Sequence, residues 1–251
     1  MCRLLGCVAG EPMSLRRELL EGETAMVRRA SEEVSGWGMA VYSRPEGNEP
    51  AVARFPHATP TPEELDRAAD MRGRIFNVHV RRATQGNLSA QNTHPFCMGN
   101  YTFAHNGTLD SALRLIEHDV PAPAGQTDSE AVFSYLMAHY DPGDPVGSLR
   151  YMVSAVIARS AFSDMGFLFS DGERLYAYRL GECELHWVAR PGQALVGSEA
   201  VTDEAWHSVQ QDVLLVLDPS RTGDPHAQRL LGNRLMRRAR IEPPLSASAA
   251  E

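Results

Sequence analysis

The chain has 251 residues, of which 43% are hydrophobic, and it carries a formal net charge of -8 at pH 7. A chain of this length and composition can bury a full core, while its acidic balance and scattered basic residues argue against a nucleic-acid surface. Its apolar runs fall short of the roughly 18 residues of a spanning helix. We therefore expect a cytoplasmic protein without membrane contact, whose partner is a small-molecule substrate.

Apolar runs of strand length recur between glycines and prolines in the first half of the chain. They predict strands over 3–8, 37–42, 51–55, 74–80 and 101–105. Apolar residues spaced three and four apart then predict helices over 108–117, 128–139 and 146–159. Strands are expected again over 165–169, 174–179, 185–189, 194–197 and 212–217. Strands, helices and strands in this order predict an α+β chain with stacked sheets and helices outside them.

The C-terminal region carries one basic cluster, from Arg234 to Arg240. We interpret it as the solvated face and positive end of a last helix. Residues 243–251 have too little apolar bulk to pack, so we expect a single domain over 2–242 followed by a disordered tail. The four cysteines do not pair at zinc spacings, which is typical of reduced cytoplasmic thiols.

Cys2 stands directly behind Met1. If Met1 is removed, one residue carries both a thiol and a free α-amine. The α-amine has a pKa near ~8, so near neutral pH a useful fraction of it is a base beside the sulfur. Such a residue is a nucleophile with its own base. A buried cysteine with a packing role is the alternative at this position.

Strand alternation places His79 and Arg81 on one face of the strand over 74–80 and Arg82 on the other. An arginine on the inner face needs a partner, and its guanidinium suits a carboxylate, whether from the protein or from a ligand. An internal salt bridge and a ligand contact therefore both remain open.

Asn106-Gly107 follows a predicted strand, where this pair ordinarily forms a turn. Its functional reading is an asparagine amide and a backbone N–H that stabilise a developing oxyanion. Asp128 opens a predicted helix beside Thr127, so it either belongs to the helix cap or binds an ammonium group. His79, His94 and His105 with Asp128 also offer ligands for a metal ion, which is a competing reading.

Taken in order, these blocks resemble the class II glutamine amidotransferases, whose fold is that of the N-terminal-nucleophile hydrolases. The blocks are Cys2-Arg3-Leu4-Leu5-Gly6, Gly36-Trp37-Gly38, His79-Val80-Arg81-Arg82-Ala83-Thr84, Asn92-Thr93-His94-Pro95, His105-Asn106-Gly107 and Thr127-Asp128-Ser129-Glu130. The resemblance extends from residue 2 to about 218, is nearest to small stand-alone members, and includes a Ser198-Glu199 step. Two positions depart from the pattern. Many relatives carry an acidic residue where Ser35 stands and a histidine where Gln85 stands. These departures concern local loop packing and selectivity more than the core chemistry.

The resemblance implies a four-layer αββα sandwich that needs neither a metal nor a cofactor. It implies that Cys2 is the nucleophile, that its α-amine is the base, and that Asn106 and Gly107 form the oxyanion hole. Arg81 would bind the substrate α-carboxylate and Asp128 the α-ammonium. Thr84 and His94 would line the pocket, while His79 and His105 would be structural hydrogen-bonding groups.

The reaction implied is attack of the Cys2 thiolate on the carboxamide of glutamine, which releases ammonia and then glutamate through a thioester. The stretch beyond the resemblance is too short for an acceptor domain. We therefore expect a separate ammonia-accepting synthase subunit as a partner, or else hydrolysis of a larger γ-glutamyl amide, as in the similar ergothioneine-pathway amidohydrolases. A catalytically idle glutamine-binding protein is the remaining alternative.

Overall fold

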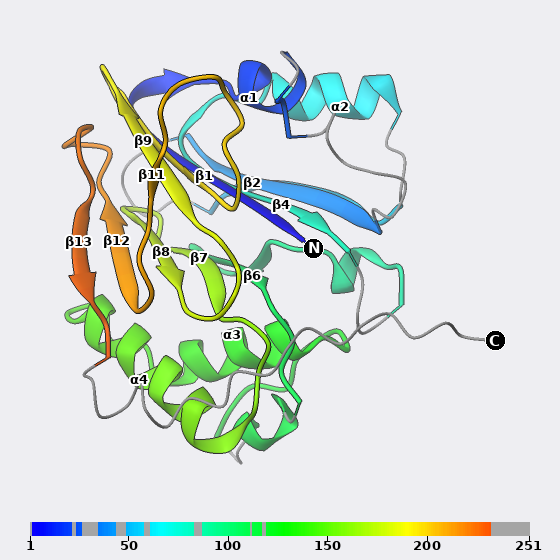
Figure 1. The fold of residues 1–251 in the computed structure, drawn as a ribbon. Helices are drawn as coiled ribbons and strands as arrows, with labels where there is room; N and C mark the ends of the chain where they lie inside the picture. Colours follow the sequence, from blue (N-terminus) through cyan, green and yellow to red (C-terminus); the bar gives the residue numbers. More distant parts are fainter. Residues whose placement is uncertain are drawn as a thin grey trace.

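Two antiparallel sheets stacked face to face form the centre of the computed structural model (Figure 1). The structure describes residues 2–21, 24–26, 35–43, 49–57, 61–82, 87–110, 112–116 and 119–231. The helix expected over the basic cluster and the tail over 243–251 lie outside the described residues. The single domain expected over 2–242 therefore stays a prediction.

The first sheet has the strand order β11-β9-β10-β1-β4-β2-β3. Its strands are β1 (Arg3–Met13), β2 (Gly36–Tyr42), β3 (Ala51–Phe55), β4 (Gly73–Arg81), β9 (His186–Arg190), β10 (Gln193–Gly197) and β11 (His207–Ser208). Arg3 pairs with Val80 of β4, and Leu5 pairs with Gly197 of β10. The start of β1 thus lies between the C-terminal ends of two neighbours.

The second sheet has the order β13-β12-β8-β7-β6-β5. Its strands are β5 (Phe96–Met98), β6 (Tyr101–Asn106), β7 (Gly166–Ser170), β8 (Leu175–Arg179), β12 (Val213–Leu217) and β13 (His226–Arg229). The β6 strand lies against β1 and β4 of the first sheet. The Asn77 amide of β4 donates a hydrogen bond to Thr102 Oγ1 of β6 at 3.3 Å, which ties the two sheets together.

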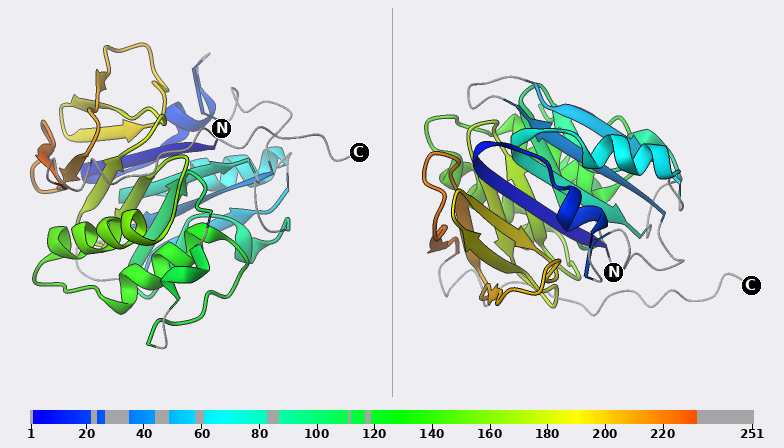
Figure 2. Two further views of the ribbon diagram at one scale, coloured as in Figure 1. Left: turned by 60° about the horizontal axis from the view of Figure 1, so that its bottom comes forward. Right: turned by 90° about the horizontal axis from the view of Figure 1, so that it is seen from above.

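Helices cover the outer face of each sheet (Figures 1 and 2). Helices α1 (Arg16–Leu20) and α2 (Pro62–Ala69) pack on the first sheet, whereas α3 (Asp128–Ala138) and α4 (Pro145–Arg159) pack on the second. The prediction of an α+β, four-layer αββα sandwich is therefore confirmed. Among the described helices, none is long and apolar enough to cross a membrane.

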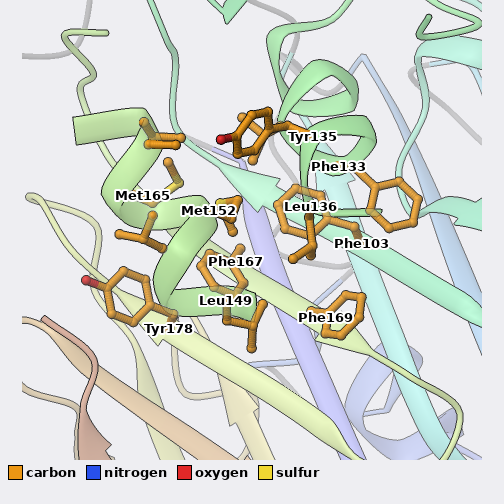
Figure 3. Close-up of a cluster of buried hydrophobic side chains, with 14 of the residues drawn as sticks. Phe103, Phe133, Tyr135, Leu136, Leu149, Met152, Met165, Phe167, Phe169 and Tyr178 are labelled. Carbon is orange, nitrogen blue, oxygen red and sulfur yellow. The ribbon is translucent and has the colours of Figure 1, made fainter. Parts of the chain in front are cut away.

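Side-chain alternation along the strands builds the layers between these elements. Val78 and Val80 of β4 belong to the core beneath α1 and α2, whereas Leu4 and Ile75 belong to the core between the sheets. A third core lies between the second sheet and its helices. Figure 3 shows its packed rings and aliphatic side chains from β6, β7, α3 and α4. The same alternation leaves polar residues of β4 on the inner face, toward the second sheet.

The helix predicted over 108–117 is wrong. Leu109 instead forms an isolated β-bridge with Phe162, and only a short 3₁₀ helix follows, over Ala112–Leu115. The backbone N–H of Leu109 donates to the Asp128 carboxylate, and that of Asp110 donates to the carbonyl of Ala161. The β-bridge and these long-range bonds hold Leu109 and Asp110 against segments distant in the sequence, so tertiary contacts override the helical pattern.

Gly38 of β2 leaves room for the segment that carries His94. A Cβ atom at Gly38 would collide with the backbone oxygen of His94 and lie 3.0 Å from that of Ala53. The Gly-Trp-Gly step therefore has a packing reason, since Trp37 points into the core beneath α1 and α2 while Gly38 admits a second chain segment.

We predict that Gly38→Ala lowers the free energy of unfolding by roughly 1–3 kcal/mol, because a rigid backbone oxygen must move. Chemical denaturation checks this value. Gly223→Ala is the matched control, since no heavy atom lies within 4 Å of the Cβ added there. Equal stability of the two variants would contradict the close approach at Gly38.

Candidate active site

Cys2 lies at the start of β1, against the end of β4. Its thiol donates a hydrogen bond to the carbonyl oxygen of Arg82 at 3.3 Å, and the Arg82 N–H donates to the sulfur at 3.1 Å. The residue is half-buried. The backbone at Arg82 therefore holds the sulfur in one place.

Burial raises the pKa of the Cys2 thiol above its ordinary value, and the backbone hydrogen bond at Arg82 and the charge of Arg81 oppose this shift only in part. The charge of Asp128 adds to the rise in the pKa of this thiol. A thiol in this setting needs a base to become a thiolate near neutral pH.

Asn106 and Gly107 stand beside Cys2 at the end of β6. The Asn106 side-chain amide donates to the carbonyl oxygen of Cys2 at 3.0 Å and, as an NH₂ group, has a second hydrogen to donate. Gly107 has φ +153, and a Cβ there would collide with the backbone oxygen of Asp164. A glycine is thus required where the chain leaves β6 beside Cys2.

Arg81 and Asp128 bring opposite charges to the neighbourhood of Cys2. They are only 3% and 6% exposed. Burial lowers the pKa of the Arg81 guanidinium, and the nearby Cys2 and Asp128 groups oppose that shift. The Asp128 carboxylate accepts from the N–H groups of Leu109 and Ser129 at 2.7 and 2.9 Å. A carboxylate has about four acceptor positions, so a ligand cation has room to bind.

Asn92 links the two segments that carry these charges. Arg81 Nη1 donates to the carbonyl oxygen of Asn87 at 3.1 Å, and Asn92 Nδ2 donates to the same oxygen at 3.2 Å. On its other side Asn92 Oδ1 accepts from the backbone N–H of Gln126 at 2.8 Å, just before Asp128. Because Asn92 is buried and bonded on both sides, it fixes the relative position of Arg81 and Asp128.

A buried group of histidines lies beneath this site. The rings of His79 and His94 have centroids 4.2 Å apart, and His94 lies 4.4 Å from the ring of Phe96. Burial lowers the pKa of His79 to about 3 and that of His94 well below its ordinary range. Both rings are therefore neutral near pH 7, and they pack as uncharged aromatic groups.

His105 has a fixed tautomer. Its Nε2 lies 3.3 Å from the backbone oxygen of Asp164, which can only accept, so Nε2 carries the hydrogen. Its Nδ1, 3.0 Å from Ser129 Oγ, then accepts from that hydroxyl. Burial lowers the pKa of His105, while the charges of Asp128 and Asp164 and a hydrogen bond oppose the shift. This neutral ring joins the end of β6 to the start of α3.

A cavity of about 300 Å³ opens beside Cys2. Its lining residues are Cys2, Arg3, Asn106, Glu184, Ser198 and Glu199. His94, expected to line the substrate pocket, is buried against rings and is not part of this wall. Thr84 lies outside the described residues. Within the described ranges, no group of three or more histidine, cysteine, aspartate or glutamate side chains could hold a metal ion.

The structure thus brings Cys2, Asn106, Gly107, Arg81 and Asp128 to one end of the stacked sheets. Sequence reasoning missed Glu184, an acidic residue of a connecting segment that no motif singles out. It also missed the part played by Asn92, although this residue opens the quoted Asn-Thr-His-Pro block. The part played by Asn92 shows only in the structure, where this buried side chain is hydrogen-bonded on both sides.

Solved structures share the fold of this chain. A glutamine aminotransferase class-II domain protein from Silicibacter pomeroyi matches with a TM-score of 0.62 at 19% identity, over 91% of this chain and 99% of that chain. The glutamine phosphoribosylpyrophosphate amidotransferase of B. subtilis matches with a TM-score of 0.68 at 17% identity, over 92% of this chain and 50% of that chain. At such identities the likeness shows the fold, which is that of the N-terminal-nucleophile amidotransferases.

Sequence comparison defines the family. The model of the class II glutamine amidotransferases matches residues 1–193. An uncharacterised protein of Methanocaldococcus jannaschii is 30% identical over 207 residues, which are 76% of this chain and 54% of that protein. The Escherichia coli protein YafJ, whose assignment as a glutamine amidotransferase is provisional, is 27% identical over 86% of this chain and 89% of its own. The chain belongs to the class II glutamine amidotransferase family, and it spans about half the length of the archaeal relative.

We predict that the protein loses stability as the pH falls from 7 to 5. The folded-state pKa values of His79 and His94 lie below the unfolded value near ~6.5, so in this window the unfolded chain binds protons that the folded chain refuses. Each such proton lowers the free energy of unfolding by at most about 1.4 kcal/mol per pH unit. Denaturation at several pH values measures the slope.

His94→Gln should make this slope shallower, because one of the buried histidines that take up a proton only on unfolding is gone. His226→Gln removes an exposed histidine and serves as the control, with a slope like that of the parent protein. If His94→Gln and the parent protein gave equal slopes, the loss of stability in acid would have another origin.

Proposed function

We propose that this protein is an amidohydrolase that cleaves the γ-carboxamide of a glutamyl substrate, with glutamine as its simplest form. The observation that carries the proposal is the meeting of the Cys2 thiol, the Asn106 amide and the paired charges of Arg81 and Asp128 at one strand end. Membership of the class II glutamine amidotransferases supports the same reaction.

The base is the α-amine that Cys2 gains when Met1 is removed. This amine takes the thiol proton, directly or through one water, and the thiolate adds to the γ-carbonyl carbon. The raised pKa of the thiol makes this base necessary, because few thiolates form unaided near neutral pH.

The tetrahedral oxyanion then needs hydrogen-bond donors where its charge develops. The second hydrogen of the Asn106 amide and the backbone N–H of Gly107 supply them. The intermediate collapses when the C–N bond breaks, and the departing amine takes the proton held by the α-ammonium. Water attacks the resulting thioester, which frees glutamate and restores the thiol.

Arg81 and Asp128 recognise the amino-acid end of the substrate. The planar guanidinium binds the α-carboxylate through two N–H groups, and the carboxylate of Asp128 binds the α-ammonium. Since both groups are buried, a ligand lacking either charge loses a contact made away from water and binds more weakly. The ammonia released from glutamine would pass to a separate synthase subunit or to solvent.

We predict that Cys2→Ala abolishes the release of glutamate and ammonia from glutamine while the protein stays folded. The reason is that no other group replaces the nucleophile. A coupled glutamate assay and circular dichroism measure the two properties. Cys97→Ala is the control, because this half-buried thiol lies on β5, away from the site.

The active form should be lighter by one methionine in an intact-mass measurement, because a retained Met1 converts the α-amine into an amide without basicity. A chain extended by one residue before Cys2 should be inactive for the same reason. Full glutamine hydrolysis by that extended chain would rule out the α-amine as the base.

We predict that Arg81→Lys weakens the apparent affinity for glutamine about tenfold or more, because a point charge replaces a two-pronged contact. The KM for glutamine reports the change. Arg82→Lys keeps the backbone atoms that hold Cys2 and alters a side chain on the opposite face, so its effect should be much smaller. The reverse pattern, with Arg82→Lys damaging and Arg81→Lys silent, would place the carboxylate elsewhere.

A further inference from the structure

The cavity beside Cys2 lies on the opposite flank from the recognition charges. In the first sheet β1 stands between β4, which ends in Arg81, and β10, which leads into Ser198 and Glu199. The Cys2 sulfur is hydrogen-bonded to the backbone of Arg82, just after β4, whereas Ser198 and Glu199, just after β10, line the cavity. Arg81 and Asp128 do not belong to its wall.

This arrangement decides which part of a substrate would meet the cavity. With the α-carbon held by Arg81 and Asp128 and the carbonyl at Cys2 and Asn106, the γ-nitrogen lies at the far end of the bound glutamyl group. Any substituent on that nitrogen extends away from the recognition charges. The cavity lined by Ser198, Glu199 and Glu184 lies in that direction.

The size of the cavity exceeds what glutamine requires. Ammonia is about as large as a water molecule, whose share of liquid volume is about 30 Å³. The cavity measures about 300 Å³, which is at the lower end of the range for small-molecule sites. It therefore has room for an organic amine.

The charges on the wall favour a cation. Among the described residues of the wall, Glu184 and Glu199 contribute two negative charges and Arg3 one positive charge, a balance of one negative unit. Arg3 Nε lies 2.9 Å from Glu199 Oε1, so these two charges are used on each other. The Glu184 side chain is 69% exposed, and its Oε2 lies 3.2 Å from His186 Nε2. That histidine neutralises the charge of Glu184 only when it is protonated.

We propose that this cavity holds the leaving group of the substrate, and that this leaving group is an amine larger than ammonia that carries a second, positively charged nitrogen. The inference rests on the proposed amidohydrolase function and defines its substrate class as γ-glutamyl amides of basic amines. The thiolate forms the S–C bond, the C–N bond breaks, and the amine leaves with the proton from the Cys2 α-ammonium. Water then cleaves the thioester.

The test compares kcat/KM for glutamine and for three γ-glutamyl amides of similar length. The amine parts are putrescine, which ends in an ammonium group, pentylamine, which ends in a methyl group, and 5-aminopentanoate, which ends in a carboxylate. We expect the putrescine amide to exceed glutamine by about tenfold and the carboxylate-ended amide to be the poorest.

Glu184→Gln should reduce the advantage of the putrescine amide over the pentylamine amide about fivefold, the effect of one partly exposed ion pair. The exposed position of Glu184 keeps this variant folded. Glu182→Gln is the matched control, since Glu182 is also exposed on the same segment but does not line the cavity. It should leave the ratio between the two amides unchanged.

Two results would overturn the proposal and leave the amidohydrolase function intact. One is hydrolysis of glutamine with all three substituted amides poorer. The other is an equal effect of Glu184→Gln on the putrescine and pentylamine amides. If no amide, glutamine included, were hydrolysed by the chain that starts at Cys2, the proposed function itself would fail, and the leaving-group site with it.

Discussion

The position of Cys2 depends on the pairing of β1 with β4 on one side and with β10 on the other. Because the start of β1 is hydrogen-bonded across the sheet on both flanks, the first described residue of the chain lies at a fixed point and not at a frayed end. The second sheet places Asn106 next to this point, since β6 lies against β1 and β4. The pairing of β1 with its two neighbours thus sets the position of Cys2 relative to Arg81 and Asn106.

Neutral packing beneath the site complements this pairing. His79 and His94 would be costly as buried cations, yet as uncharged rings they pack against each other, and His94 also packs against Phe96, in tilted contacts. Because Gly38 of β2 has no side chain, the backbone at His94 can approach this strand closely enough for the rings to pack. The segment from 87 to 94 is therefore held at both ends. At its start the Asn87 carbonyl accepts hydrogen bonds from Arg81 and Asn92, and at its end the His94 ring packs against its neighbours.

Much of the fold could be predicted from the sequence, because the runs that form β2, β4 and β6 have the length and composition of strands, which is a local signal. The five-residue α1, the two-residue β11 and the edge strand β13 were missed, since short elements carry little periodic signal and depend on tertiary contacts. The apolar spacing after Asn106 fits a helix, yet Leu109 forms a β-bridge with Phe162, a contact that no local pattern predicts. The resemblance to a known family predicted that Arg81 and Asp128 lie close together. No local sequence pattern predicts that Glu184 lines the cavity, so this position could be found only from the fold.

The contact between Cys2 and Arg82 has a consequence for how this protein can vary in evolution. Both hydrogen bonds to the sulfur use main-chain atoms of Arg82, a donor and an acceptor that every residue except proline possesses. Selection on the position of the Cys2 thiol would therefore constrain the path of the backbone at residue 82, and these two bonds do not depend on which side chain stands there. Drift at position 82 among relatives would carry no information about whether the thiol is still held, while a proline there would mark its loss.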